Sequence, residues 1–144
     1  MKFVEQVIDD LKESEANGRL LNLDGVTGLS GDKLIGFLQR SARSAGRQED
    51  TAYLEVGVFQ GLTLSSVASS APQLSCFGID DFSQFDPENK NKAIVEARLA
   101  EHCRGNGVLI DADFEEALLN LRGHLDRKRI CLLYTSDAAD DYFW

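Results

Sequence analysis

The sequence predicts an α/β fold: a parallel, doubly wound sheet of about four strands, preceded by a helical lead-in. From residue 51 onward, four short apolar runs, rich in β-branched residues, alternate with segments of helical periodicity. Strands that alternate with crossover helices lie parallel in one sheet, with helices packed on its faces. The chain has 144 residues, which suits a single domain.

The first 48 residues are predicted to be a helical segment. An amphipathic helix is expected over residues 3–15, and the Asn17-Gly18 turn signal ends it. Its apolar stripe consists of Phe3, Val4, Val7, Ile8 and Leu11. A second helix begins after Ser30-Gly31 and stops at Gly46. We therefore place residues 1–48 apart from the α/β unit, which we assign to residues 49–130.

The α/β unit is expected to contain four strands and three helices. The strands are predicted at residues 51–58, 74–79, 108–113 and 129–134. The connecting helices are predicted at residues 62–70, 88–102 and 114–122.

Composition excludes several classes of protein. The net charge of −9 argues against a nucleic-acid partner, because phosphate backbones are bound by clustered Lys and Arg. No apolar run approaches the roughly 20 residues that span a bilayer, and the N-terminus lacks a signal-peptide core. Three widely spaced cysteines do not form a disulfide framework. A reduced, cytoplasmic protein without a membrane partner is the expectation.

The residues that follow the strands are the candidates for a binding site, because ligands of such sheets bind at the carboxyl ends of the strands. The first strand leads into Glu55-Val56-Gly57-Val58-Phe59-Gln60-Gly61. Gly57 would let a ligand approach the backbone, and Gly61 suits the turn into a helix whose free N–H groups face the site. Phe59 could touch the ligand, although packing is the simpler role for it.

Two acidic residues follow the next strands. Asp80 lies nineteen residues beyond Gly61, and a carboxylate there could accept hydrogen bonds from both hydroxyls of a ribose. Asp113 follows the third strand and could accept a hydrogen bond from an adenine amino group, or it could be only the cap of the next helix. Taken together, a glycine turn followed by two acids at this spacing predicts a site for a nucleoside cofactor.

The glycine pattern distinguishes between cofactors. A dinucleotide fingerprint requires G-x-G-x-x-G, but here Phe59 stands at the position of the middle glycine. No Gly-Lys-Ser or Gly-Lys-Thr follows the first strand, so a P-loop is excluded. The pattern E-x-G-x-x-x-G resembles motif I of class I S-adenosylmethionine-dependent methyltransferases. YLEVGVFQGLTL followed by FGIDDFSQF is similar to a branch of small-molecule and sugar O-methyltransferase-like proteins.

The resemblance covers about residues 50–130 and implies a Rossmann-like fold, S-adenosylmethionine as the cofactor and a small-molecule methyl acceptor. It implies that Glu55 and Gly57 face the methionine end of the cofactor, with Val58 and Phe59 in the same loop. Asp80 would hold the ribose and Asp113 the adenine. Neither the acceptor nor a general base nor the oligomeric state follows from the sequence. An NAD-type oxidoreductase and a non-catalytic α/β binding module remain as alternatives.

The C-terminal stretch does not continue the pattern. Class I methyltransferases usually have seven strands, and this sequence offers four. Residues 131–140, CLLYTSDAAD, resemble a translated adapter of the kind used to prepare sequencing libraries. We therefore expect a truncated chain in which residues 131–144 are a non-native tail, and we expect the fragment to be inactive by itself. Asp137, Asp140 and Asp141 are candidate acids in this stretch, but no Gly or His accompanies them, so no metal site is predicted.

Overall fold

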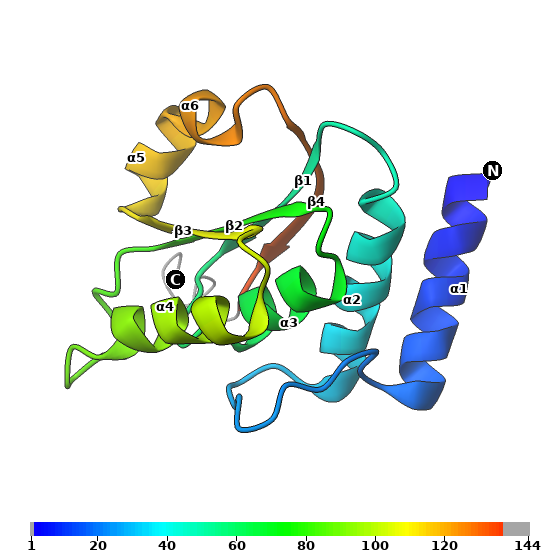
Figure 1. Ribbon diagram of the computed structural model, residues 1–144, viewed down its shortest axis with the longest axis horizontal. Helices are drawn as coiled ribbons and strands as arrows, with labels where there is room; N and C mark the ends of the chain where they lie inside the picture. The colour runs from blue at the N-terminus through cyan, green and yellow to red at the C-terminus, as the bar shows by residue number, and fades with distance from the viewer. Residues whose placement is uncertain (1, 137–144) are drawn as a thin grey trace.

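The computed structural model describes residues 2–136, which form a four-stranded sheet covered by helices on both faces (Figure 1). The strands are β1 (Thr51–Val56), β2 (Ser75–Asp80), β3 (Gly107–Asp111) and β4 (Arg129–Thr135). The helices are α1 (Lys2–Asn17), α2 (Asp32–Ala45), α3 (Leu62–Ser70), α4 (Asn91–His102), α5 (Phe114–Leu119) and α6 (Leu121–Leu125). Asp137, Asp140 and Asp141 lie outside the described residues.

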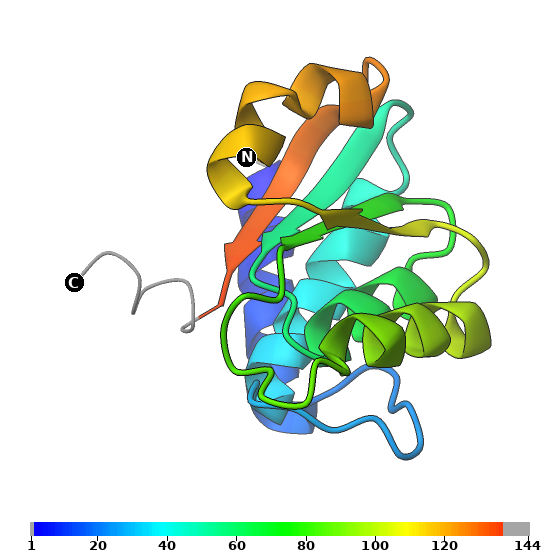
Figure 2. The ribbon, with the colours of Figure 1, turned by 90° about the vertical axis from the view of Figure 1, so that its left-hand side faces the viewer.

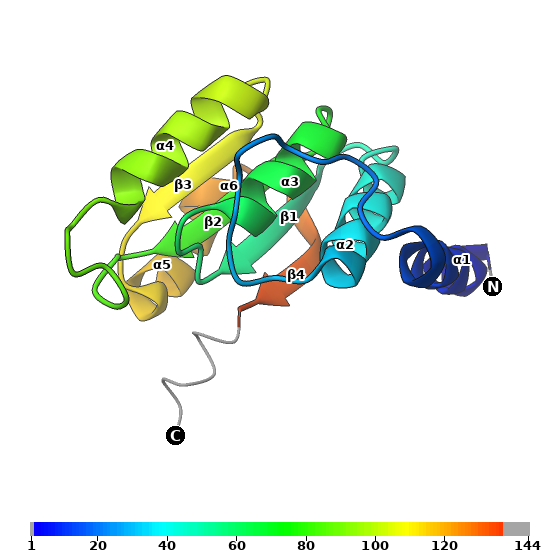
Figure 3. The same cartoon turned by 90° about the horizontal axis from the view of Figure 1, so that it is seen from below.

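All strand pairs are parallel, in the order β3-β2-β1-β4. α2, α3 and α4 lie side by side on one face of the sheet, while α5 and α6 lie on the other (Figure 3). The chain therefore changes direction between β1 and β4, which is the switch point at which ligands of doubly wound sheets bind. This arrangement confirms the predicted fold class, a Rossmann-like doubly wound sheet of four strands with a helical lead-in.

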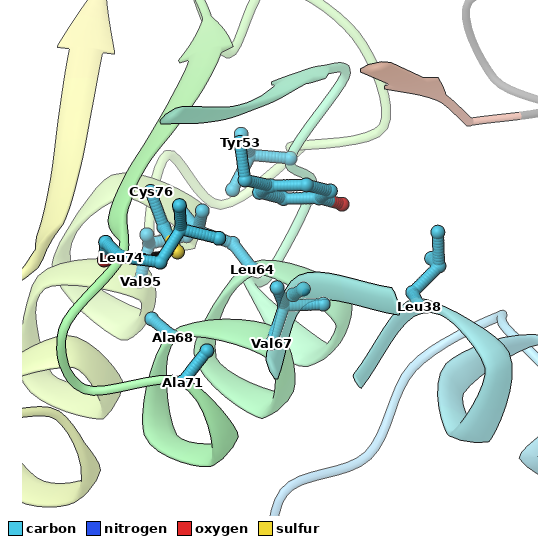
Figure 4. Close-up of a cluster of buried hydrophobic side chains, with 11 residues drawn as sticks. Leu38, Tyr53, Leu64, Val67, Ala68, Ala71, Leu74, Cys76 and Val95 are labelled. Carbon is cyan, nitrogen blue, oxygen red and sulfur yellow. Dashed lines mark hydrogen bonds between the residues drawn. The ribbon is translucent and has the colours of Figure 1, made fainter. Parts of the chain in front are cut away.

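The larger part of the core lies between the sheet and α3. Figure 4 shows side chains of α3 turned toward Tyr53 and Cys76 of the sheet. Gly78 lies in the middle of β2, where an added Cβ would come within 2.6 Å of Leu64 and 2.7 Å of Val58. Glycine is therefore needed there, because it lets α3 and the loop after β1 pack directly against the strand.

The other face of the sheet is less completely covered. Phe77 and Ile79 pack there with residues of α5 and α6. β4 is one of the two edge strands, with β3 at the other edge (Figure 2), and its side chains Ile130 and Leu133 on this face are exposed. β4 pairs with β1 as far as Thr135, so the first residues of the expected tail complete this strand.

α1 is amphipathic as predicted, but its apolar stripe does not face the core. The helix lies outside α2 (Figure 1) and contacts it through Asp10 and Ser14, which are its buried residues. Arg40 of α2 donates a 3.3 Å hydrogen bond to the hydroxyl of Ser14. Most apolar residues of the stripe point to solvent, with Phe3 75% exposed, while Val7 is half-buried. Periodicity predicted the helix and its stripe, while polar contacts decide which side of the helix packs.

Several element boundaries differ from the prediction. β1 ends at Val56 rather than at residue 58, and α4 begins at Asn91 rather than at residue 88. The single helix expected at residues 114–122 is divided at Asn120, whose ψ of 14° leaves the helical range, into α5 and α6. β3 ends at Asp111, so Asp113 lies beyond the strand rather than at its end. No helix within residues 2–136 is long and apolar enough to cross a membrane.

Candidate functional site

A cavity of about 350 Å³ opens at the carboxyl edge of the sheet. All four strand ends contribute to its walls, through Gly57, Asp80, Asp113 and Ser136 among others. One wall is apolar and includes Leu54, Ile79, Ala112, Phe114, Leu118, Leu121, Ile130 and Leu133. The charged groups that line the cavity are the carboxylates Asp80, Asp81 and Asp113, and no Lys, Arg or His of the described chain is among the lining residues.

The loop between β1 and α3, residues 57–61, is hereafter the glycine loop. Gly57, Phe59 and Gly61 all have positive φ, at 85°, 54° and 83°. A loop of alternating left-handed residues points its successive N–H groups toward a common centre and so forms an anion-binding concavity. Phe59 is strained in this conformation, since it has a Cβ.

The anion that occupies this concavity is the protein's own Asp80. One carboxylate oxygen, Oδ2, accepts hydrogen bonds from the N–H groups of Val58 and Phe59, both at 2.9 Å. The other oxygen accepts the N–H of Phe82 at 2.8 Å. A carboxylate has about four acceptor positions, so about one remains for a ligand. This one position can serve one ribose hydroxyl, not the two predicted for Asp80 from the sequence. The other hydroxyl therefore needs a second acceptor nearby.

Asp81 is suited to be that second acceptor. It is exposed, lines the cavity and accepts the N–H of Ser83 through Oδ1 at 2.9 Å. The sequence pattern singles out Asp80 and gives Asp81 no role. β2 ends at Asp80, so strand alternation does not turn the Asp81 side chain to the opposite face of the sheet.

Glu55 does not line the cavity. Its side chain lies within the core between the sheet and α3, where only 1% of the residue is exposed. The hydroxyl of Tyr53 donates a 2.8 Å hydrogen bond to Glu55 Oε1. Burial raises the pKa of Glu55 to about 8, with a further contribution from the negative charge of Asp80, while the Tyr53 hydrogen bond acts in the opposite direction. Glu55 is therefore largely neutral at pH 7.

Asp113 lines the cavity and also caps α5. Its Oδ1 accepts the N–H groups of Glu115 and Glu116, at 3.0 and 3.4 Å. The capping role considered from the sequence is therefore present, and it uses one of the two carboxylate oxygens. Asp111, the last residue of β3, lies apart from the cavity and forms a 2.7 Å ion pair with Lys92.

The remaining candidates divide between backbone and side-chain roles. The Val58 side chain is buried in the core, so this residue contributes its N–H group alone. Phe59 lines the cavity, as does Phe85, which the sequence did not single out. Phe85 follows β2 in a loop whose conformation no local pattern predicts. Within residues 2–136, no three His, Cys, Asp or Glu side chains are grouped closely enough to hold a metal ion.

Comparison with family models and with curated proteins gives no match. Among solved structures, the chain is similar to coclaurine N-methyltransferase bound to N-methylheliamine and SAH, with 13% identity and a TM-score of 0.43 over 78% of this chain. It is also similar to the apo structure of CalS11, a TDP-rhamnose 3'-O-methyltransferase of calicheamicin biosynthesis, with 18% identity and a TM-score of 0.44 over 94% of this chain. The matched regions are 37% and 62% of those two proteins' lengths.

Proposed function

We propose that this chain is the cofactor-binding part of an S-adenosylmethionine-dependent methyltransferase that acts on an oxygen of a small molecule or sugar. The observation that carries the proposal is the glycine loop whose anion-binding N–H groups are already taken by Asp80, beside a cavity whose lining charges, among residues 2–136, are all negative. S-adenosylmethionine has a positive sulfonium and no phosphate, so these carboxylates attract it.

The same observation disfavours a dinucleotide. In a dinucleotide fold the loop after the first strand receives a pyrophosphate on its free N–H groups. Here a pyrophosphate would have to displace Asp80 and would meet Asp81 and Asp113, with no lining cation in the described chain to offset the repulsion. The NAD-type alternative is therefore disfavoured at the glycine loop, where a dinucleotide would place its pyrophosphate.

The proposed roles follow the geometry. Asp80 holds the glycine loop and offers its remaining acceptor position to a ribose hydroxyl, while Asp81 accepts the other hydroxyl. Asp113 accepts the adenine amino group through Oδ2, and Phe59 borders the ligand. Gly57, at the end of β1, lets the methionine end approach the backbone, while Glu55 is enclosed in the core, where Tyr53 donates a hydrogen bond to it. The bound cofactor supplies an electrophilic methyl group, and the protein's contribution is to hold it in line with an acceptor oxygen.

Three further proposals go beyond the site. We propose that the parent enzyme is cytoplasmic and that this chain alone binds the cofactor weakly without turnover. We also propose that residues 131–144 are not native, on the strength of their resemblance to a translated adapter. An intact reading frame encoding this tail at the source locus would contradict the proposal of a non-native tail.

Calorimetric titration of the chain with S-adenosylhomocysteine and with NAD⁺ tests the function. We expect S-adenosylhomocysteine to bind and NAD⁺ to give no detectable heat. Tighter binding of NAD⁺ would favour the oxidoreductase, and binding of neither would favour a non-catalytic module.

A further inference from the structure

One face of α4 packs directly on the glycine loop. Asn91, Val95 and Arg98 lie four and three residues apart, so they share one side of the helix. The side-chain oxygen of Asn91 accepts a 3.1 Å hydrogen bond from Gln60 Nε2, and Arg98 donates a 2.7 Å hydrogen bond to the backbone oxygen of Gln60. A Cβ placed on Gly61 would lie 3.3 Å from a methyl group of Val95. The loop is therefore held by α4 at two consecutive residues.

The two polar residues of this face also reach other loops. Asn91 is almost fully buried, and its amide nitrogen donates a 3.1 Å hydrogen bond to the backbone oxygen of Phe85. Arg98 donates a second hydrogen bond, of 3.0 Å, to the backbone oxygen of Thr27. Asn91 thus joins the glycine loop to the segment after β2, and Arg98 joins it to the segment before α2.

The segments joined by Asn91 carry strained aromatic residues at the cavity. Phe59 and Phe85 both line the cavity, and both have positive φ, at 54° and 55°. A residue with a Cβ is strained in the left-handed conformation, so it stays there only where several contacts of the surrounding structure hold the backbone. Asp80 fixes the N–H groups of the glycine loop from β2, and α4 fixes its last two residues from the opposite side.

The contacts of Arg98 indicate that it binds backbone rather than a carboxylate. Within residues 2–136 it takes part in no ion pair, and its two hydrogen bonds go to backbone oxygens. Partial burial lowers the pKa of its guanidinium. The Arg98 guanidinium is partly desolvated where it binds these two backbone carbonyl groups. Because charged donors form stronger hydrogen bonds than neutral donors, Arg98 is suited to holding the two loops in place.

We propose that Asn91 and Arg98 are positioning residues for the cofactor site, which act through Gln60 to hold the glycine loop and through Phe85 to fix the neighbouring wall of the cavity. Neither residue lines the cavity, so each acts without touching the ligand. The use of S-adenosylhomocysteine as the ligand in the binding test rests on the proposed function. The inference that Asn91 and Arg98 hold the loops does not rest on it, and hydrogen exchange tests that inference without a ligand.

Arg98→Met is the first variant, and Arg43→Met is its matched control. Arg43 also donates a hydrogen bond to a backbone oxygen, that of Ser70 at 3.2 Å, but it lies on α2 away from the cavity. We expect Arg98→Met to weaken S-adenosylhomocysteine binding about tenfold, the loss expected for one hydrogen bond from a charged donor. Arg43→Met should leave the affinity unchanged, and Arg98→Lys should recover part of the loss. Equal losses of affinity in the two methionine variants would overturn the proposal.

Gln60→Ala isolates the link to Asn91, because it removes the side chain and keeps the backbone oxygen that Arg98 binds. If Asn91 acts through Gln60, Asn91→Ala should weaken binding less in the Gln60→Ala background than in the wild type. Fully additive effects would exclude the Gln60 route.

Amide hydrogen exchange tests the same inference without any ligand. We expect Arg98→Met to speed exchange at residues 57–61 and in the segment around Thr27, the two segments that Arg98 bonds, and Arg43→Met to leave both segments unchanged. Unchanged exchange in Arg98→Met would overturn the positioning role. If exchange rises as expected but the wild type binds no S-adenosylhomocysteine, the positioning role stands and the proposed function fails.

Discussion

Glu55 is a carboxylic acid enclosed in the core, and its protonation links the stability of the fold to pH. Its pKa is raised from 4.5 to about 8 by burial, whereas the unfolded chain returns it to the ordinary value. Between these two values the folded protein binds a proton that the unfolded chain does not. The contribution of Glu55 to stability is therefore fully present below pH 4.5 and is lost as the pH rises through about 8.

Glu55→Gln should remove this dependence, because the amide does not titrate. Between pH 5.5 and 7.5 we expect the free energy of unfolding of the wild type to fall relative to that of the variant, by at most about 1.4 kcal/mol per pH unit. Urea denaturation of both proteins at the two pH values measures the difference. The exposed Glu49→Gln serves as the control, and parallel behaviour of Glu55→Gln and the wild type would contradict the assignment.

The neighbours Asp80 and Asp81 should respond differently to the same substitution. Asp80→Asn places an NH₂ group where three backbone N–H donors now meet a carboxylate, so we expect a loss of about 1–3 kcal/mol of stability. Asp81→Asn keeps the turn to Ser83 and should change stability by less than about 0.5 kcal/mol. Thermal unfolding of the two variants measures this contrast.

Ligand binding should separate the two acids as well. If Asp81 accepts a ribose hydroxyl, Asp81→Asn weakens S-adenosylhomocysteine binding while the protein remains as stable as the wild type. Calorimetric titration at matched pH measures the affinity. If the Asp81→Asn variant binds S-adenosylhomocysteine as tightly as the wild type does, Asp81 does not bind the ribose, and Asp80 is left as the acid that contacts it.

Among the elements, α3 depends on a side chain that lies outside it. Asn106 precedes β3, and its amide nitrogen lies 2.9–3.0 Å from the backbone oxygens of Ala68, Ala71 and Leu74, which share its two N–H donors. The carbonyl groups at the end of a helix lack partners within the helix, so a donor there stabilises the helix end. One residue thereby joins the end of α3, the turn after it and the start of β3.

Asn106→Asp should be more destabilising than Asn106→Ala. Alanine leaves the three carbonyl oxygens without this donor, which we expect to cost about 1–3 kcal/mol. Aspartate has nearly the same shape but would set a negative charge against those oxygens, so its loss should be larger. The difference between the two variants is measured by denaturant midpoint at pH 7. It should shrink at a pH low enough to protonate the aspartate, and a constant difference would contradict the electrostatic explanation.

The elements also show how far sequence reasoning extends. The strands were predicted to within a few residues, because each is a short apolar run between turn signals. The division at Asn120 was missed, since the apolar periodicity continues across it. The role of Asp80 in holding the glycine loop could not be predicted, because it depends on the positive φ of Phe59, a non-glycine residue. The links from Asn91 and Arg98 join segments up to 71 residues apart, which no local pattern encodes.

At the scale of the whole molecule, two apolar surfaces of the described chain face solvent. One is the stripe on α1, and the other is the face of β4 that carries Ile130 and Leu133. Exposed apolar side chains on an edge strand favour association with other chains. We therefore expect the chain to associate in a concentration-dependent way, with β4 as the main surface of contact.

Leu133→Lys tests this expectation, because it places a charge on this edge strand at a side chain that is 58% exposed. A lysine at an exposed strand edge opposes edge-to-edge pairing through repulsion and through the cost of desolvating it. Light scattering over a concentration series should show less association for Leu133→Lys than for the wild type. Leu29→Lys is the matched control, since Leu29 is 84% exposed in the loop before α2 and belongs to no strand of the sheet. If both variants reduce association equally, general charge rather than β4 governs the behaviour. If neither does, the apolar face of β4 is not the surface through which these chains meet.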